Sequence, residues 1–217
     1  MAAPFTLPPL YPILDAGLLA AAGISIESFA RELHSAGIRF LQYRDKNGSD
    51  REMMERAAML RRIFPAPESL LILNDRVRLC RDVGFDGVHL GQQDMAPAET
   101  RLLLGRAAII GLSTHNRGQL TVADTTDADY LAIGPVFATA SKQNPDPVVG
   151  LAGVREARSL TAKPLVAIGG ITAARCRAAI EAGADSVAVV AGLLPGPERT
   201  ARQAAEEFAR VLAATWE

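Results

Sequence analysis

Cysteine is scarce in this sequence, and its placement argues against two kinds of stabilising site. The 217 residues include two cysteines, Cys80 and Cys176, which lie far apart and belong to no CxxC or Cys/His cluster. A zinc site needs closely spaced ligands, and a disulfide framework needs several paired cysteines. We therefore expect two buried free thiols in a reducing cytosol.

Aromatic residues and excess charge are scarce as well. Aromatic residues make up 5% of the chain, hydrophobic residues 49% and charged residues 22%, and the formal net charge is -1. These values fit a globular protein and argue against disorder or an aromatic all-β core. Proteins that bind nucleic acid or anionic membranes usually carry a basic excess, so we expect neither partner.

The sequence has no apolar run long enough to span a bilayer. The N-terminal stretch MAAPFTLPPLYPILDAG lacks a basic region and is interrupted by Pro4, Pro8, Pro9 and Pro12, and the LLAAAGI that follows is short. Secretory leaders and membrane helices need longer uninterrupted apolar segments. We expect a cytoplasmic protein without a membrane anchor.

Short apolar runs alternate with amphipathic stretches along the chain. Apolar residues recur with helical spacing over residues 51–64, 172–184 and 199–216. Eight apolar runs indicate strands, at residues 10–15, 38–44, 69–74, 86–90, 107–113, 129–135, 164–170 and 185–191.

This alternation predicts a parallel sheet covered by helices, because parallel strands need long crossovers and are buried on both faces. Eight such units in a chain of this length fit one α/β domain over residues 1–217, a single (β/α)8 TIM barrel. An open doubly wound sheet is the alternative, but no GxGxxG motif follows the first strand and no Walker lysine motif is present.

The C-terminal ends of the predicted strands carry many polar residues. In a barrel these ends meet on one face, which is where the active sites of such enzymes lie. The residues that end or directly follow the second to seventh strands are Gln42, Arg44 and Lys46; Asn74 and Asp75; His89, Gln92 and Asp94; Ser113 and His115; Thr139, Ser141 and Lys142; and Gly169 and Gly170.

Two carboxylates at neighbouring strand ends suit a magnesium ion, which binds oxygen ligands and often shares them with substrate phosphates. Asp75 and Asp94 are the candidate ligands, and Arg44, Lys46 and Lys142 could bind the remaining phosphate oxygens. Together these residues describe a diphosphate site. The alternative is that Asp75 and Asp94 cap the helices that follow them.

A second anion site is predicted near the last two strands. Paired glycines in IGGIT allow backbone N–H groups to approach an anion, and the helix N-terminus adds partial positive charge. Gly170 and the turn at Val190, Ala191 and Gly192 occupy the two positions where barrels often bind phosphate. A tight turn with no ligand is the alternative for either loop alone.

The histidines and Ser113 allow several interpretations. His89 points away from Val88 and Leu90 by strand alternation, so it either faces the barrel mouth or is a hydrogen-bonded core residue. His115 is either a general acid or base, or a capping or exposed residue. Ser113 has no convincing Ser-His-Asp order, so we do not interpret it as a hydrolase nucleophile.

The ordered motifs QYRDK, ND, HLGQQD, GLSTH, GPVFATASK and IGGI resemble the thiamin phosphate synthase family across nearly the whole chain. The resemblance implies a (β/α)8 transferase of a pyrimidinylmethyl group. Its substrates would be 4-amino-5-hydroxymethyl-2-methylpyrimidine diphosphate and 4-methyl-5-(2-phosphooxyethyl)thiazole. Its products would be thiamin phosphate and diphosphate, formed by a dissociative substitution that Mg²⁺ assists.

The resemblance also implies residue roles. Asp75 and Asp94 would bind Mg²⁺, and Arg44, Lys142 and Ser113 would act in catalysis. The substrates would be bound by Gln42, Arg44, Lys46, Asn74, His89, Ser113, Lys142, Thr139, Ser141, Gly170, Val190 and Ala191. Two positions depart from the family pattern: Ser141 replaces an expected threonine, and Ala191 stands where serine is frequent, which removes one side-chain phosphate contact.

The sequence leaves two other functions open. A thiazole tautomerase on the same fold would be an isomerase, but that relative lacks the GQxD element that residues 91–94 carry. A non-catalytic sensor would bind both phosphate ligands without turnover. The sequence also leaves the oligomeric state open, a homo-oligomer included.

Overall fold

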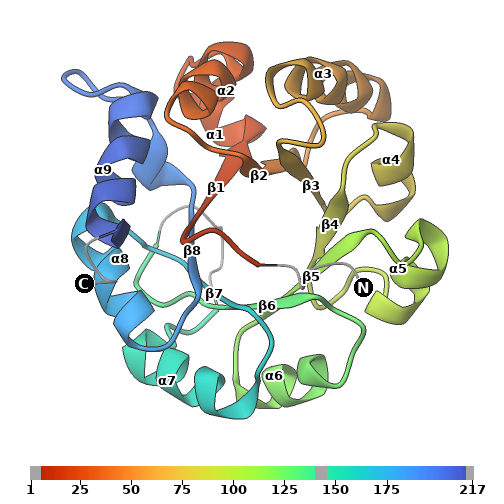
Figure 1. Ribbon diagram of the computed structural model, residues 1–217, viewed down its shortest axis with the longest axis vertical. Helices are drawn as coiled ribbons and strands as arrows, with labels where there is room; N and C mark the ends of the chain where they lie inside the picture. The colour runs from red at the N-terminus through yellow and green to blue at the C-terminus, as the bar shows by residue number, and fades with distance from the viewer. Residues whose placement is uncertain (1–5, 140–145, 214–217) are drawn as a thin grey trace.

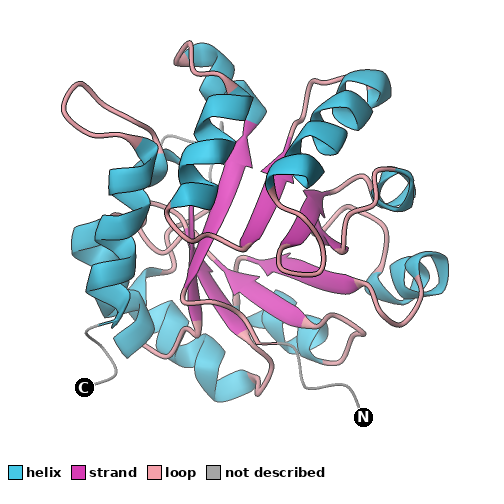
Figure 2. Ribbon diagram, turned by 45° about the horizontal axis from the view of Figure 1, so that its top comes forward, coloured by secondary structure: helices cyan, strands magenta, loops and turns pink. Residues whose placement is uncertain are grey.

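The computed structural model describes residues 6–139 and 146–213 as a closed barrel of eight parallel strands in chain order, which confirms the predicted fold class. Helices surround the barrel on the outside (Figures 1 and 2). The strands are β1 (Leu10–Asp15), β2 (Phe40–Arg44), β3 (Leu70–Asn74), β4 (Gly87–Leu90), β5 (Ile109–Thr114), β6 (Tyr130–Ile133), β7 (Leu165–Ile168) and β8 (Ser186–Val189).

The predicted runs locate every strand but extend too far at several ends. The sixth and seventh runs include glycines that lie beyond the ends of β6 and β7, and the eighth run includes Ala191, which begins a short 3-10 helix. The helices are α1 (Ala16–Ala21), α2 (Ile26–Ser35), α3 (Asp50–Ile63), α4 (Val77–Asp82), α5 (Pro97–Leu104), α6 (Arg117–Asp124), α7 (Gly150–Leu160), α8 (Ala173–Glu181), η1 (Ala191–Leu193) and α9 (Ala201–Ala213).

Strand alternation divides the buried side chains into two clusters. Outward-facing residues such as Leu41 and Val88 pack against the helices, and inward-facing residues such as Ile72 and Val166 fill the barrel. Leu7, in the segment before β1, packs against the inner cluster, and Figure 1 shows this segment crossing the open end of the barrel. The interior is therefore a filled core at that end and not a pore.

Two further sequence expectations bear on the fold. Cys80 and Cys176 are buried free thiols, as expected. Among the residues that the structure describes, no helix is both long enough and apolar enough to cross a membrane.

The same ionic brace recurs at the N-terminal end of three strands. An aspartate directly before the strand accepts a hydrogen bond from a backbone N–H of the preceding strand. It also pairs with an arginine of the helix that comes before that preceding strand. The arginine also donates to loop carbonyls. The braces are Asp86 with Leu71 and Arg61, Asp129 with Ile110 and Arg101, and Asp185 with Leu165 and Arg158.

We predict that Asp129→Ala destabilises the barrel by about 2 kcal/mol, because it removes a charged acceptor from two donors. The Asp129 carboxylate lies 2.7 Å from both the Ile110 N–H nitrogen and the Arg101 guanidinium. Urea unfolding measures the change, and Asp127→Ala at the exposed neighbouring aspartate is the control. Equal unfolding midpoints for the two variants would contradict the brace.

Candidate active site

Four charged side chains from three strand ends lie together at the C-terminal rim of the barrel. The pKa of Asp75 is raised to about 6, first by burial and then by the charge of Asp94 and a hydrogen bond with it. The positive charges of Lys46 and Arg44 act in the opposite direction on the same carboxyl. Such effects require short separations, so the predicted carboxylates and two of the predicted cations share one site.

The backbone at Asp75 is strained. β3 ends at Asn74, which pairs with His89 of β4, and Asp75 follows with a φ of 64°. Among the described residues it is the one non-glycine with a positive φ, a conformation that costs about 1–3 kcal/mol. A backbone hydrogen bond from the Asp75 N–H to the His89 carbonyl, at 2.9 Å, holds this geometry. Strain of this kind is concentrated at functional sites.

The helix-capping alternative for the two aspartates is wrong. Arg76 is the N-cap of α4 and Ala96 is the N-cap of α5, and neither helix has a side-chain capping hydrogen bond. The Asp94 carboxylate instead accepts a hydrogen bond from the Gly91 N–H at 2.6 Å. Neither carboxylate is therefore consumed by helix capping.

The GQQD segment folds back on itself and against the next strand. Besides the contact between Asp94 and Gly91, the Gln92 side-chain amide donates to the backbone carbonyl of Ser113 at 2.6 Å. Gln92 therefore ties the loop after β4 to the end of β5. The Gln92 amide in the polar segment after β4 therefore has a structural role, because it fixes the loop that carries Asp94.

Arg44 is held in place by a partner that the sequence interpretation missed. Asp15, at the end of β1, forms an ion pair with Arg44 and accepts a hydrogen bond from the Leu18 N–H at 2.9 Å. Asp15 stands opposite Arg44 in the register of β1 and β2. The signal was present, because the first predicted run ends in an aspartate, but only the pairing of the strands shows which cation it contacts.

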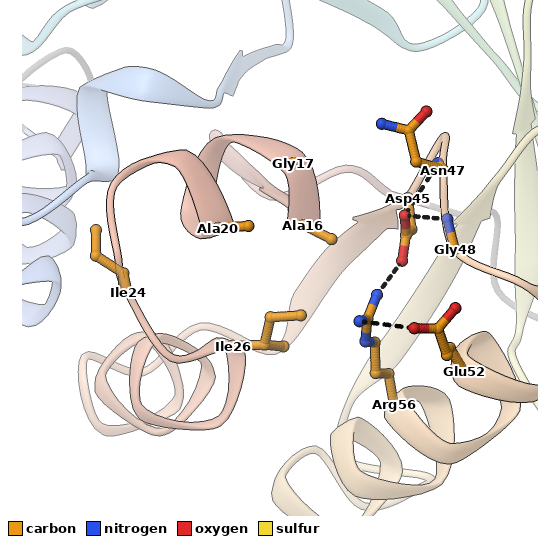
Figure 3. A pocket seen from close by; sticks show the side chains of 10 residues that line it. All are labelled: Ala16, Gly17, Ala20, Ile24, Ile26, Asp45, Asn47, Gly48, Glu52 and Arg56. Atoms are coloured by element: carbon orange, nitrogen blue, oxygen red, sulfur yellow. Dashed lines mark hydrogen bonds and ion pairs between the residues drawn. The ribbon is translucent and has the colours of Figure 1, made fainter.

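A second ion pair fixes the loop that carries Lys46. Asp45 is buried, pairs with Arg56 of α3 and accepts hydrogen bonds from Gly48 and Tyr43 at 2.8 and 3.0 Å. Burial opposes its ionisation, but these hydrogen bonds hold the pKa of Asp45 below its usual value. Figure 3 shows this pair at the edge of a cavity of about 370 Å³ between α1 and the loop.

A continuous row of hydrogen-bonded side chains crosses the barrel interior beneath the charged rim. The Gln42 amide donates to the Tyr11 hydroxyl at 2.8 Å, and the Tyr11 and Tyr130 hydroxyls are 2.8 Å apart. Tyr130 then contacts His89 Nδ1 at 2.9 Å, and His89 Nε2 contacts Ser113 Oγ at 2.8 Å. Tyr11 and Tyr130 are the two members of this row that sequence reasoning assigned to no site.

His89 is a hydrogen-bonded core residue that also lies next to the barrel mouth, so the two alternatives that the sequence left open are compatible. It faces the barrel interior, is 8% exposed and stacks on the Tyr130 ring at a centroid distance of 5.5 Å. Burial lowers its pKa to about 4, against a smaller opposing effect of the Asp94 charge. The imidazole is therefore neutral at neutral pH, and its contact with Ser113 connects the buried row to the rim.

The paired glycines after β7 have a packing role. Gly169 and Gly170 have φ values of 98° and 63°, and a Cβ atom at Gly170 would lie 2.5 Å from the carbonyl oxygen of Ala138. The Phe137 N–H donates to the Gly169 carbonyl at 3.0 Å. The glycines thus allow the loop after β6 to pack against the end of β7, which brings Thr139 near the predicted second anion site.

His115 joins the loop after β5 to the loop after β6. Its Nδ1 lies 2.7 Å from the Gly134 carbonyl oxygen, and its Nε2 lies 3.6 Å from the Asp146 carboxylate. His115 does not cap α6, because Asn116 is the N-cap and accepts from the Gln119 N–H. His115 therefore contacts the chain after β6 at two points, Gly134 and Asp146.

The remaining predicted residues are placed as follows. Val190 directly follows β8, and Ala191 begins η1. The N-cap of α8 is Thr172, whose side chain makes no capping hydrogen bond. Ser141 and Lys142 lie outside the described residues. Across residues 6–139 and 146–213, no three His, Cys, Asp or Glu side chains form a group able to hold a metal, so Asp75 and Asp94 stand as a pair.

Comparison with known proteins identifies the family. A family described as "Thiamine monophosphate synthase" matches residues 10–193. The chain is 52% identical over 214 residues to the "Thiamine-phosphate synthase" of Koribacter versatilis, covering 98% of this chain and 99% of the relative. It is 38% identical over 208 residues to the protein of that name from Chloroflexus aurantiacus, covering 96% and 94%.

A solved structure agrees with the sequence relatives. The "Thiamine phosphate pyrophosphorylase" of Pyrococcus furiosus superposes with a TM-score of 0.83 and 31% identity, covering 96% of each chain. The resemblance inferred from the ordered strand-end motifs is confirmed: this chain belongs to the thiamine monophosphate synthase family.

Proposed function

We propose that this chain joins 4-amino-5-hydroxymethyl-2-methylpyrimidine diphosphate to 4-methyl-5-(2-phosphooxyethyl)thiazole, giving thiamin phosphate and diphosphate. The observation that carries the proposal is the grouping of Asp75 and Asp94 with Arg44 and Lys46 at one rim of the barrel. Carboxylates and cations in one site suit a diphosphate that arrives with a divalent metal. Two relatives are named for this activity, and this chain matches each of them over nearly its whole length.

The diphosphate is bound by cations that the fold holds rigidly. Arg44 is a fork-shaped donor whose position is fixed by Asp15, and Lys46 sits on the loop fixed by Asp45. Asn74, at the end of β3, adds an amide beside this group. The expected contribution of Lys142 is part of the same proposal, on a segment outside the described residues.

Asp75 and Asp94 fit a magnesium ion. Neither carboxylate caps a helix, and burial followed by the charge of Asp94 raises the pKa of Asp75 to about 6. Hard oxygen ligands are what Mg²⁺ selects. Bound Mg²⁺ would neutralise negative charge on the leaving diphosphate. Two carboxylates would fill only part of the coordination shell of Mg²⁺, and water and phosphate oxygens would fill the remaining positions.

The thiazole phosphate is assigned to the opposite part of the rim. The proposed contacts are Thr139, Ser141, Gly170 and the backbone of Val190 and Ala191. Support comes from the N-terminus of α8, which has no side-chain cap and is separated from the glycine pair by Ile171 and Thr172 alone. The two anion sites would then face each other, so that the thiazole nitrogen can approach the pyrimidine methylene carbon.

The reaction needs no protein nucleophile. The bond between the methylene carbon and the diphosphate oxygen breaks, and its electron pair leaves with the diphosphate, where Arg44 and Lys46 stabilise the charge. The lone pair of the thiazole nitrogen then forms the new bond to the methylene carbon. Ser113 and His89, at the inner edge of the rim, contact the pyrimidine diphosphate, and the packed interior excludes water from below.

The two other functions are distinguished by specific features. Residues 91–94 carry the GQxD element, and its aspartate lies beside Asp75 in the structure, which favours handling of a diphosphate over tautomerisation. Turnover separates an enzyme from a sensor. Thiamin phosphate formation from the two substrates, with Mg²⁺ and then with excess chelator, tests the proposal; folded protein that gives no product with Mg²⁺ would overturn it.

We predict that Asp94→Ala lowers Mg²⁺-dependent turnover by about 10- to 100-fold, the loss expected for one interaction between charged groups of about 1.5–3 kcal/mol. Binding of the thiazole phosphate, measured by calorimetry, should be unchanged because the two anion sites are separate. Gln93→Ala, at the exposed neighbouring position, is the matched control. Equal loss of turnover and thiazole binding would refute this division of roles.

We also predict that Asp15→Asn raises the KM for the pyrimidine diphosphate by about tenfold, because Arg44 loses its charged partner. Asparagine retains an oxygen for the Leu18 N–H, so α1 keeps its cap. The KM for the thiazole phosphate should not change. If Asp15→Asn has the same effect in an Arg44→Ala background, Asp15 does not act through Arg44.

A further inference from the structure

The hydrogen bonds of the buried row from Gln42 to Ser113 can be assigned donors and acceptors in sequence. The Gln42 amide nitrogen donates to the Tyr11 hydroxyl, and Tyr11 is 1% exposed. Tyr11 has one proton, and its other contact in the row is the Tyr130 hydroxyl, 2.8 Å away. If Tyr11 also accepted from Tyr130, its own buried proton would have no acceptor in the row, which is costly. Tyr11 therefore donates to Tyr130.

The same reasoning carries the direction onward to the rim. If Tyr130 accepts from Tyr11, the acceptor that the row offers for its own proton is His89 Nδ1, 2.9 Å away. A neutral imidazole that accepts at Nδ1 carries its proton on Nε2. That proton is donated to Ser113 Oγ at 2.8 Å. Ser113 then accepts a hydrogen bond within the row and donates its hydroxyl proton to no member of it.

A glycine on β5 leaves the space that the Tyr130 ring needs. A Cβ atom at Gly111 would overlap the ring and hydroxyl of Tyr130. Gly111 stands opposite both His89 and Tyr130 in the strand register. The inner wall thus lacks a side chain where the Tyr130 ring must sit to reach Tyr11. β1 and β6 are not neighbours in the ring, because β7 and β8 separate them (Figure 1).

We propose that Tyr130 and Tyr11 are positioning residues that hold His89 as the Nε2–H tautomer. Ser113 therefore accepts from His89 and has its own proton free to donate to an acceptor atom of the pyrimidine diphosphate. The last step rests on the proposed function, whereas the tautomer does not. Neither tyrosine contacts the substrate; each acts through His89.

The first test reads the tautomer directly. Nitrogen-15 NMR of histidine-labelled protein distinguishes protonated from unprotonated ring nitrogens, and the chain has three histidines, so His89→Gln assigns the signal. We expect Nε2 protonated and Nδ1 unprotonated for His89 in the wild type. Tyr130→Phe and Gly111→Ala should each mix or reverse the two forms. Protonated Nδ1 in the wild type would overturn the inference.

The second test asks whether Tyr130 acts through Ser113. We expect Tyr130→Phe and Ser113→Ala each to lower kcat by about tenfold, the effect of one lost hydrogen bond, and the double variant to lose little more than Ser113→Ala. Ser113→Thr keeps the hydroxyl and should restore most of the rate. Losses that multiply in the double variant would show that Tyr130 affects activity through packing alone.

A matched control removes a buried hydroxyl outside the row. Thr114 neighbours Ser113 on β5, is 1% exposed and donates to the Ala132 carbonyl at 2.8 Å. Thr114→Val should leave both the His89 tautomer and kcat unchanged.

The two measurements separate the two proposals. Because the NMR measurement needs no turnover, a wild type that forms no product refutes the proposed function alone. Product formation by a wild type with Nδ1 protonated refutes the positioning role alone.

Discussion

Closure of eight parallel strands is the constraint on which the rest of this structure depends. Every strand ends at the same rim, so residues from distant parts of the sequence, such as Asp15, Arg44 and Asp94, meet there. The opposite end of the barrel carries three aspartate–arginine braces that join strand, helix and strand. The polar chemistry is thus divided between stabilising contacts at one end and a candidate active site at the other.

Charge balance at the rim follows from this geometry. Asp75 and Asp94 are close enough that burial and mutual repulsion raise the pKa of Asp75, while Arg44 and Lys46 limit the effect. The group holds two close carboxylates and two cations, and it suits a metal-bound diphosphate, which brings a cation for the carboxylates and anionic oxygens for Arg44 and Lys46. The strained backbone at Asp75 is consistent with a position selected for ligand binding.

Much of this could be predicted from the sequence, because apolar strand runs and the polar residues that end them are local signals. The barrel, the inward direction of His89 and the neighbouring positions of Asp75 and Asp94 all follow from strand order and alternation. The strand runs were too long where glycines or a 3-10 turn follow. Capping by Asp75 and Asp94 was wrong because the loops continue past each aspartate before the helix begins.

The rest depended on contacts around the ring that no local pattern contains. Tyr11 and Tyr130 lie inside apolar runs and resemble ordinary core residues in the sequence. Their hydroxyls meet only because β1 and β6 face each other across the interior, with Gly111 leaving space. Asp15 was missed for the same reason, since the strand register determines its partner. The glycine pair after β7 supports a neighbouring loop, which its motif alone does not indicate.

The central claim is that the grouped carboxylates and cations bind a metal diphosphate. A crystal structure of the protein with Mn²⁺ and inorganic diphosphate tests it most directly, because the anomalous signal of Mn²⁺ locates the metal. The account predicts Mn²⁺ bound by Asp75 and Asp94, with the diphosphate contacting Arg44 and Lys46. Diphosphate bound elsewhere, or Mn²⁺ that contacts neither carboxylate, would contradict it.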